Sequence, residues 1–119
     1  MPEMPKEMEE KILEFQQAQE QLQLIVGQKM QFKMQMDEIG LASESLESAK
    51  GKVYKSTGAI IIEADKGALG KELGEKKEML TVSMQVLGKQ EEKLRKRLLE
   101  LRSELESGAK GMPPTKKSG

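Results

Sequence analysis

Side chains that could carry out catalysis or hold a metal are scarce in this sequence. The chain has no Cys and no His, so it lacks the thiol of cysteine nucleophiles and zinc sites and the imidazole of most general bases. Its Asp and Glu side chains fall on helix faces that we expect to be solvated, and it contains no GxxxxGK(S/T) phosphate-binding loop. We therefore expect a protein that is not an enzyme and that binds no cofactor or metal.

The composition indicates long helices. The 119 residues include 20 Lys and Arg against 20 Asp and Glu, and only 3% are aromatic while 34% are charged. High charge with few aromatic residues is typical of coiled coils, and a net charge of zero argues against a nucleic-acid partner. The longest apolar run, residues 59–62, is far shorter than the roughly 20 residues that span a bilayer. The first ten residues lack the apolar stretch of a signal peptide, so we expect a cytoplasmic protein with no membrane contact.

The chain divides into three segments and a tail. Residues of about 6–50 and 66–107 are helical in composition, and a short block at 51–64 separates them. The end, 108–119, is rich in Gly, Pro and Lys and is expected to be disordered. We interpret the whole as one domain.

Both helical segments carry an apolar seam with alternating spacings of three and four residues. This spacing is the heptad pattern of a helix that packs along another helix. The principal seam residues are Phe15, Leu22, Ile25, Phe32, Met36, Leu80, Met84, Leu87, Leu94, Leu98 and Leu101.

Polar residues inside the seams predict how the helices pair. Lys29 and Ser43 interrupt the first seam, and Lys77 and Glu91 interrupt the second. One antiparallel register places Lys29 opposite Glu91 and Ser43 opposite Lys77, and in that register every apolar layer meets another apolar layer. A slip by one heptad would bury Lys29 or Glu91 against Leu, which disfavours the alternatives. The sequence thus predicts an antiparallel coiled coil within one chain.

The block between the helices predicts a β-hairpin. Val53, Tyr54 and the run Ile60, Ile61 and Ile62 are strong strand formers, and the residues of 56–58 are suited to a turn between them. The three isoleucines do not alternate with polar residues, so both faces of this strand require burial. A lone hairpin cannot bury both faces. We therefore expect the hairpins of several subunits to join.

Two helices with a hairpin inserted between them resemble the prefoldin fold. The block VYKSTGAIII is similar to the segment that enters the hairpin in archaeal prefoldin beta subunits, and ILEFQQAQEQLQLIVGQK and QEEKLRKRLLEL are similar to their two helices. The resemblance covers about residues 6–107, and a single hairpin suits the beta rather than the alpha class.

The resemblance implies an ATP-independent chaperone that captures unfolded proteins and transfers them to a group II chaperonin. It implies a hetero-hexamer of two alpha and four beta subunits, in which the hairpins assemble into a β-barrel and the coiled coils extend from it. A structural coiled-coil adaptor or filament-forming relative, without client transfer, is the alternative. A partner alpha subunit encoded in the same genome would favour the chaperone. Homo-oligomers of open-ended size would favour the structural or filament-forming protein.

The family places client binding at the free ends of the coiled coil. There the seam continues outward through Met8 and Met4, while the opposite helix offers only Gly108 and Met112. Apolar side chains without a partner layer, methionines above all, suit promiscuous binding. The predicted client-binding residues are Met4, Met8, Ile12, Leu13, Leu105 and Met112.

Two further groups of residues lie outside the seam. Met30, Met34 and Met79 are apolar where a two-helix coil leaves side chains in water, and they indicate either a contact surface or scattered surface residues. The basic cluster at 93–97 alternates with acidic residues and is interpreted as a solvated face.

Overall fold

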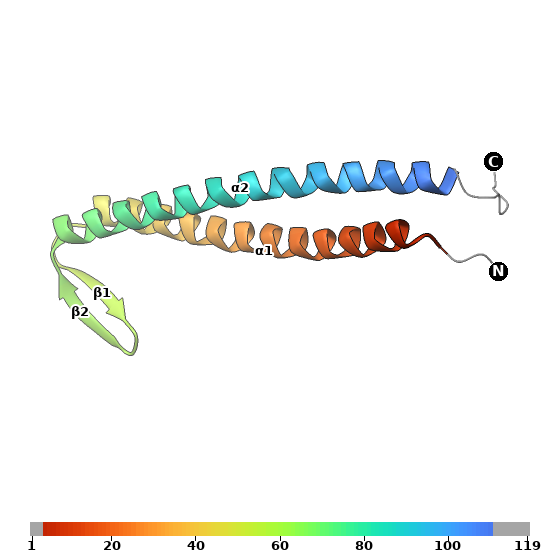
Figure 1. The fold of residues 1–119 in the computed structure, drawn as a ribbon. Helices are drawn as coiled ribbons and strands as arrows, with labels where there is room; N and C mark the ends of the chain where they lie inside the picture. The colour runs from red at the N-terminus through yellow and green to blue at the C-terminus, as the bar shows by residue number, and fades with distance from the viewer. Residues whose placement is uncertain (1–3, 111–119) are drawn as a thin grey trace. The chain divides into compact units, whose positions relative to one another are not determined.

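The computed structural model describes residues 4–110 and contains four elements in the order α1, β1, β2 and α2 (Figure 1). Helix α1 spans Lys6–Ser48, strands β1 and β2 span Val53–Thr57 and Ile60–Ala64, and helix α2 spans Lys66–Lys110. The prediction of two long helices with a β-hairpin between them is confirmed. The joining of hairpins into a barrel stays a prediction.

The end of α2 differs from the sequence prediction. The helix continues through residues 108–110, where a disordered tail was expected. One glycine in a helix costs only about 1 kcal/mol relative to Ala, and the first proline after α2 is Pro113, so Gly108 does not end the helix. The remaining tail residues lie outside the described part of the chain.

The residues at each end of α1 explain where this helix starts and stops. The Pro5 carbonyl accepts hydrogen bonds from the amides of Met8 and Glu9, at 3.0 and 3.1 Å. The acidic side chains of the first turn suit the positive end of the helix dipole. After Ser48 the chain turns away through Gly51, whose φ of 94° favours glycine.

Asp65 and Lys66 form the start of α2. The Asp65 carboxylate accepts a hydrogen bond from the Ala68 amide at 2.9 Å, which makes Asp65 the N-cap. Lys66 extends back and donates from Nζ to the carbonyls of Ala49 and Glu47, at 3.0 and 3.4 Å. The last turn of α1 has no basic residue of its own, so Lys66 supplies the positive charge that this end of the dipole attracts.

The hairpin pairs β1 and β2 in antiparallel register from Val53 opposite Ala64 to Thr57 opposite Ile60. The turn lies at Gly58 and Ala59, so the predicted turn at residues 56–58 is corrected by one residue. Gly58 has a φ of 59° and Ala59 does not have a positive φ, the pattern of a type II′ turn. Such a turn follows the right-handed twist of the strands.

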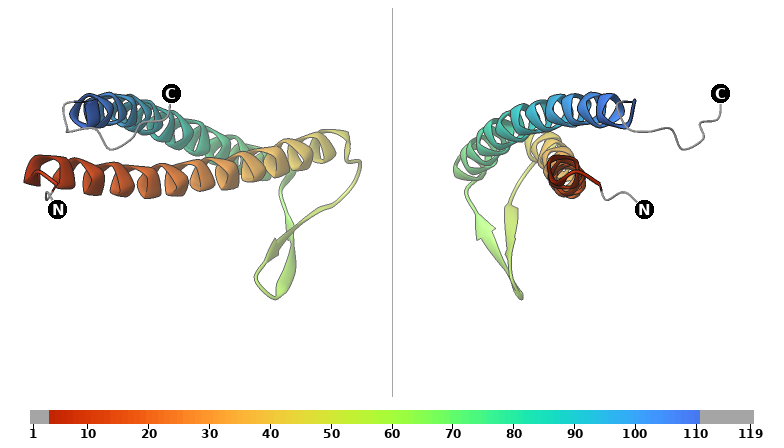
Figure 2. Two further views of the ribbon diagram at one scale, coloured as in Figure 1. Left: turned by 90° about the vertical axis from the view of Figure 1, so that its right-hand side faces the viewer. Right: turned by 45° about the vertical axis from the view of Figure 1, so that its right-hand side comes forward.

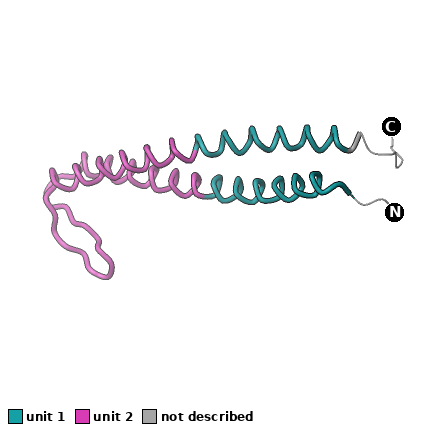
Figure 3. Tube along the Cα trace, viewed as in Figure 1, with its two compact units in different colours: residues 1–27, 88–119 teal, residues 28–87 magenta. Residues whose placement is uncertain are grey.

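The chain forms two compact units (Figure 3). Unit 1 contains the described residues of 1–27 and 88–119, and unit 2 contains residues 28–87 with the hairpin. Within unit 2 the hairpin projects from the ends of the two helices (Figure 2). Each unit joins one part of α1 to one part of α2.

Each unit has a narrow core along the line where its two helix segments meet. The buried apolar side chains are Ala18, Ile25 and Leu101 in unit 1, and Ile39, Leu80 and Leu87 in unit 2. All of them occupy seam positions, because Ala18 and Ile39 continue the alternating three- and four-residue spacing of the first seam. Leu101 is the most deeply buried of them, with 0% of its surface exposed.

Candidate functional site

The predicted client-binding residues of unit 1 fall into two groups by exposure. Met4 and Leu13 are 41% and 55% exposed. Met8, Ile12 and Leu105 are half-buried. Met112 lies outside the described residues.

Met8 lies opposite Gly108 of α2, one of the two residues expected on the other helix at this end. Because α2 continues to Lys110, Gly108 lies beside Met8, and a Cβ atom at position 108 would overlap the Met8 methyl group. Leu105 and Lys11 contribute to the same shallow groove of about 190 Å³. The side chains of Met8 and Leu105 are therefore partly covered at this end of unit 1.

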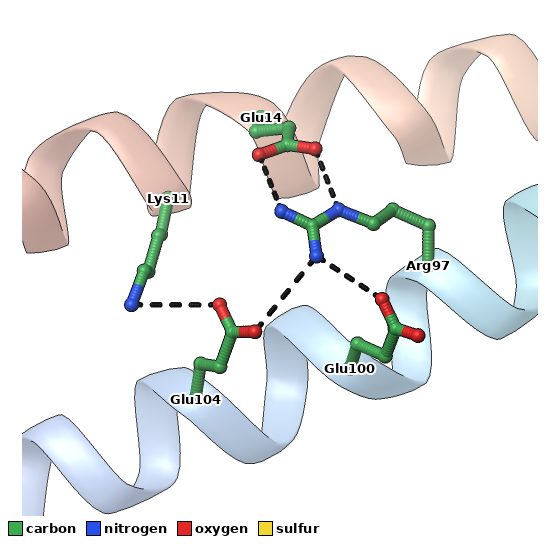
Figure 4. Close-up of polar contacts among 5 residues, drawn as sticks. All are labelled: Lys11, Glu14, Arg97, Glu100 and Glu104. Carbon is green, nitrogen blue, oxygen red and sulfur yellow. Dashed lines mark hydrogen bonds and ion pairs between the residues drawn. The ribbon is translucent and has the colours of Figure 1, made fainter.

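A network of ion pairs joins α1 to α2 in unit 1 (Figure 4). The Arg97 guanidinium donates from Nε and Nη2 to the two carboxylate oxygens of Glu14, at 2.7 and 2.9 Å. It also contacts Glu100 at 3.1 Å and Glu104 at 3.8 Å, and Glu104 contacts Lys11 at 3.4 Å. Bidentate pairs of this kind fix the relative orientation of the two groups. The helices here run antiparallel, because the later residue of α1 pairs with the earlier residue of α2.

The network shifts the pKa values of its central pair. The hydrogen bonds from Arg97 are the largest effect and lower the pKa of Glu14. Burial opposes them by raising this pKa, and the charge of Arg97 adds a smaller lowering. Hydrogen bonds to Glu14 and Glu100 raise the pKa of Arg97. Both groups therefore remain charged at neutral pH.

This pair was not predicted from the sequence, in which Arg97 stands out only as one member of a basic cluster. The available signal was position: Glu14 and Arg97 directly precede the seam residues Phe15 and Leu98. Residues that flank an apolar seam are those that form ion pairs between the helices of a coiled coil. In the same cluster, Arg95 pairs with Glu91 at 2.8 Å.

All eleven principal seam residues are buried or half-buried. In unit 1, Leu22 and Leu98 line one groove of about 320 Å³ together with Phe15. Of the polar seam residues, Ser43 is half-buried and Lys77 is exposed, both within unit 2. The predicted pairing of Lys29 with Glu91 joins residues of different units and stays a prediction.

The hairpin exposes apolar side chains on both of its faces. Ile61 is 72% exposed and projects to the face that Tyr54 shares, whereas Ile60 and Ile62 are exposed on the other face. Val53 is half-buried. Lys55 ties the hairpin to α2 through an ion pair with Glu72 at 2.6 Å.

Exposed methionines also occur along the helices of unit 2. Met30, Met34 and Met79 are all exposed, outside the seam.

Neither a metal site nor a membrane span is evident among residues 4–110. No cluster of three or more acidic side chains there is arranged to hold a metal ion. The described helices contain no segment long and apolar enough to cross a bilayer.

Comparison with known proteins identifies the family. A model of the family described as prefoldin subunit matches residues 9–111. The prefoldin beta subunit of Methanothrix thermoacetophila is 31% identical over 114 residues, which cover 94% of this chain and 95% of that protein. The prefoldin beta subunit of Archaeoglobus fulgidus is 34% identical and is covered to 94%, along 90% of this chain. The prefoldin beta subunit of Thermococcus kodakarensis is 33% identical, and the match covers 97% of this chain and 98% of that protein.

A solved structure agrees with these relatives. The crystal structure of the prefoldin beta subunit from Thermococcus strain KS-1 superimposes with a TM-score of 0.82 and 33% identity, over 95% of this chain and 100% of that one. The chain therefore belongs to the prefoldin family, within the beta-subunit branch that these archaeal proteins represent.

Proposed function

We propose that this chain is the beta subunit of an ATP-independent chaperone that holds unfolded proteins in the cytoplasm and transfers them to a group II chaperonin. Membership of the prefoldin family carries this proposal, because the family is one of chaperones and its beta subunits assemble with other prefoldin subunits. The proposed assembly contains two alpha and four beta subunits.

The hairpin is the proposed assembly surface. Four large apolar side chains, those of Tyr54 and Ile60–Ile62, are exposed on a hairpin of only two strands. A two-stranded hairpin has two free edges, and pairing with strands of other subunits satisfies those edges and buries the isoleucines. This surface suits a β-barrel built from several chains.

The proposed client site is the end of unit 1 where α1 begins and α2 ends. Met4 and Leu13 present exposed apolar surface there, with Met8, Ile12 and Leu105 beside them. An unfolded client offers apolar side chains of varied shape. Flexible methionines adapt to such shapes without the defined pocket that a specific ligand requires.

Aggregation of a denatured client tests the proposed site. The variant Met4→Ser/Leu13→Ser removes exposed apolar area at the proposed site, and Leu99→Ser removes exposed apolar area elsewhere in unit 1. We expect the double variant, assembled with an alpha subunit, to lose most of its suppression of aggregation, because several subunits multiply the loss. Leu99→Ser is expected to retain it.

Equal suppression by the wild type and Met4→Ser/Leu13→Ser would refute this site. Native mass spectrometry of the same samples tests the assembly. A hexamer with alpha subunits supports the proposal, whereas homo-oligomers of open-ended size would indicate a structural or filament-forming protein.

A further inference from the structure

Gly108 occupies a position where glycine is not required by the backbone. It lies inside α2, and the glycines with positive φ among the described residues are Gly51 and Gly58. An alanine would therefore fit the helical backbone of position 108 and favour the helix. At position 108, unlike at Gly88 of the same helix, a neighbouring side chain fills the space that a Cβ atom would take.

That space is occupied by Met8. A Cβ atom at position 108 would overlap the Met8 methyl carbon and approach its sulfur to 3.9 Å. Leu105, one turn earlier on α2, borders the same groove, and Lys11 pairs with Glu104 at its edge. These contacts leave Met8 half-buried, while Met4 next to it in the seam is exposed.

We infer that Gly108 is a seat for the Met8 side chain, which holds Met8 against α2 until a client displaces it. The inference rests on the proposed function, in which Met8 belongs to the client-binding surface. Met8 has three rotatable bonds beyond its backbone and can leave the seat without a change in either helix. Seated Met8 reduces the apolar surface that the free chaperone exposes, and a client must bind strongly enough to shift Met8 outward.

The variant Gly108→Ala tests the seat because the new methyl group occupies it. The colliding atom is the far end of a flexible side chain, so Met8 moves rather than the backbone. Gly88→Ala is the matched control: Gly88 also lies in α2 and in unit 1, and a Cβ there meets no atom within 4 Å. Both substitutions replace a glycine of α2 with alanine, and only one of them displaces Met8.

Oxidation of Met8 by hydrogen peroxide reports its position. The thioether sulfur takes one oxygen atom from the peroxide, which is released as water, and the rate follows the exposure of the sulfur. In the purified full-length chain, peptide mass spectrometry should find Met8 oxidised more slowly than Met4. In Gly108→Ala its rate should rise to that of Met4, while Gly88→Ala leaves it unchanged. The same Met8 rate in all three proteins would overturn the seat.

Client capture tests the second half of the inference. With Met8 released, Gly108→Ala should suppress aggregation at a lower chaperone concentration than the wild type or Gly88→Ala. Faster Met8 oxidation without improved capture would refute the holding role of the seat. The Met4→Ser/Leu13→Ser variant tests the proposed function separately. Of the Met4, Met8 and Leu13 side chains, only that of Met8 lies within 4 Å of a Cβ atom at position 108.

Discussion

Arg97 of α2 donates two hydrogen bonds, of 2.7 and 2.9 Å, to the carboxylate of Glu14 of α1. It is the central residue of the ion-pair network in unit 1. Such a contact forms only when each helix is correctly rotated about its own axis and the two helices are correctly aligned along their length. It therefore selects one register of the antiparallel pair. The seam alone constrains this register less, because its apolar layers resemble one another.

The stability of unit 1 should depend on pH through Glu14. Its pKa is lowered in the folded chain by Arg97, so its stabilising contribution is fully present above the ordinary pKa of Glu and is lost as the pH falls through the lowered value. Thermal unfolding followed by circular dichroism should show a smaller decrease in Tm on acidification for Glu14→Gln than for the wild type. Both groups are partly exposed, so we expect a small difference. Identical pH profiles would show that the pair contributes nothing measurable.

Leu101 should be the most sensitive apolar position in unit 1. Its side chain is fully buried, and Leu→Ala at such sites costs about 2–5 kcal/mol. The neighbouring Leu99 is 66% exposed, and Leu99→Ala should change the free energy of unfolding by less than about 0.5 kcal/mol. Denaturant unfolding of the two variants measures the contrast. Similar losses in both would contradict the position of the core.

A disulfide can test the register of the coiled coil directly. Leu22 and Leu98 line one groove in unit 1. Cysteines at these two positions should form a disulfide within one chain on mild oxidation. The chain has no native cysteine that could interfere. More efficient linkage of position 22 to a cysteine at 91 or 105 would show that the predicted register is displaced by a heptad.

Ile61→Lys should prevent assembly without unfolding the helices. Ile61 is exposed in the single chain, so a charge there costs the isolated subunit little, whereas burial of an unpaired charge between hairpins is strongly unfavourable. Size-exclusion chromatography should show a loss of the oligomer, and circular dichroism should show unchanged helicity. Ile61→Val keeps the apolar character and should assemble normally. A full-size oligomer of Ile61→Lys would place the interface elsewhere.

The sequence alone determined the elements and which of their faces are apolar. Heptad spacing predicted two long helices, and the run of isoleucines predicted a hairpin that cannot be buried by its own chain. These features depend on local periodicity and composition, which are written directly in the order of residues. In the structure Ile61 is exposed, as expected of an unbroken run of isoleucines that its own chain cannot bury.

Only the tertiary structure decided which polar and small residues contact each other. Glu14 and Arg97 are 83 positions apart in the chain, and Lys66 reaches carbonyls of the preceding helix that no local pattern indicates. The contact of Met8 with Gly108 was likewise not predictable. In the sequence a glycine suggests the end of a helix, and it becomes a seat only when another helix places a side chain against it. Such contacts depend on the azimuth of one helix relative to the other, and a heptad pattern fixes that angle too coarsely to predict them.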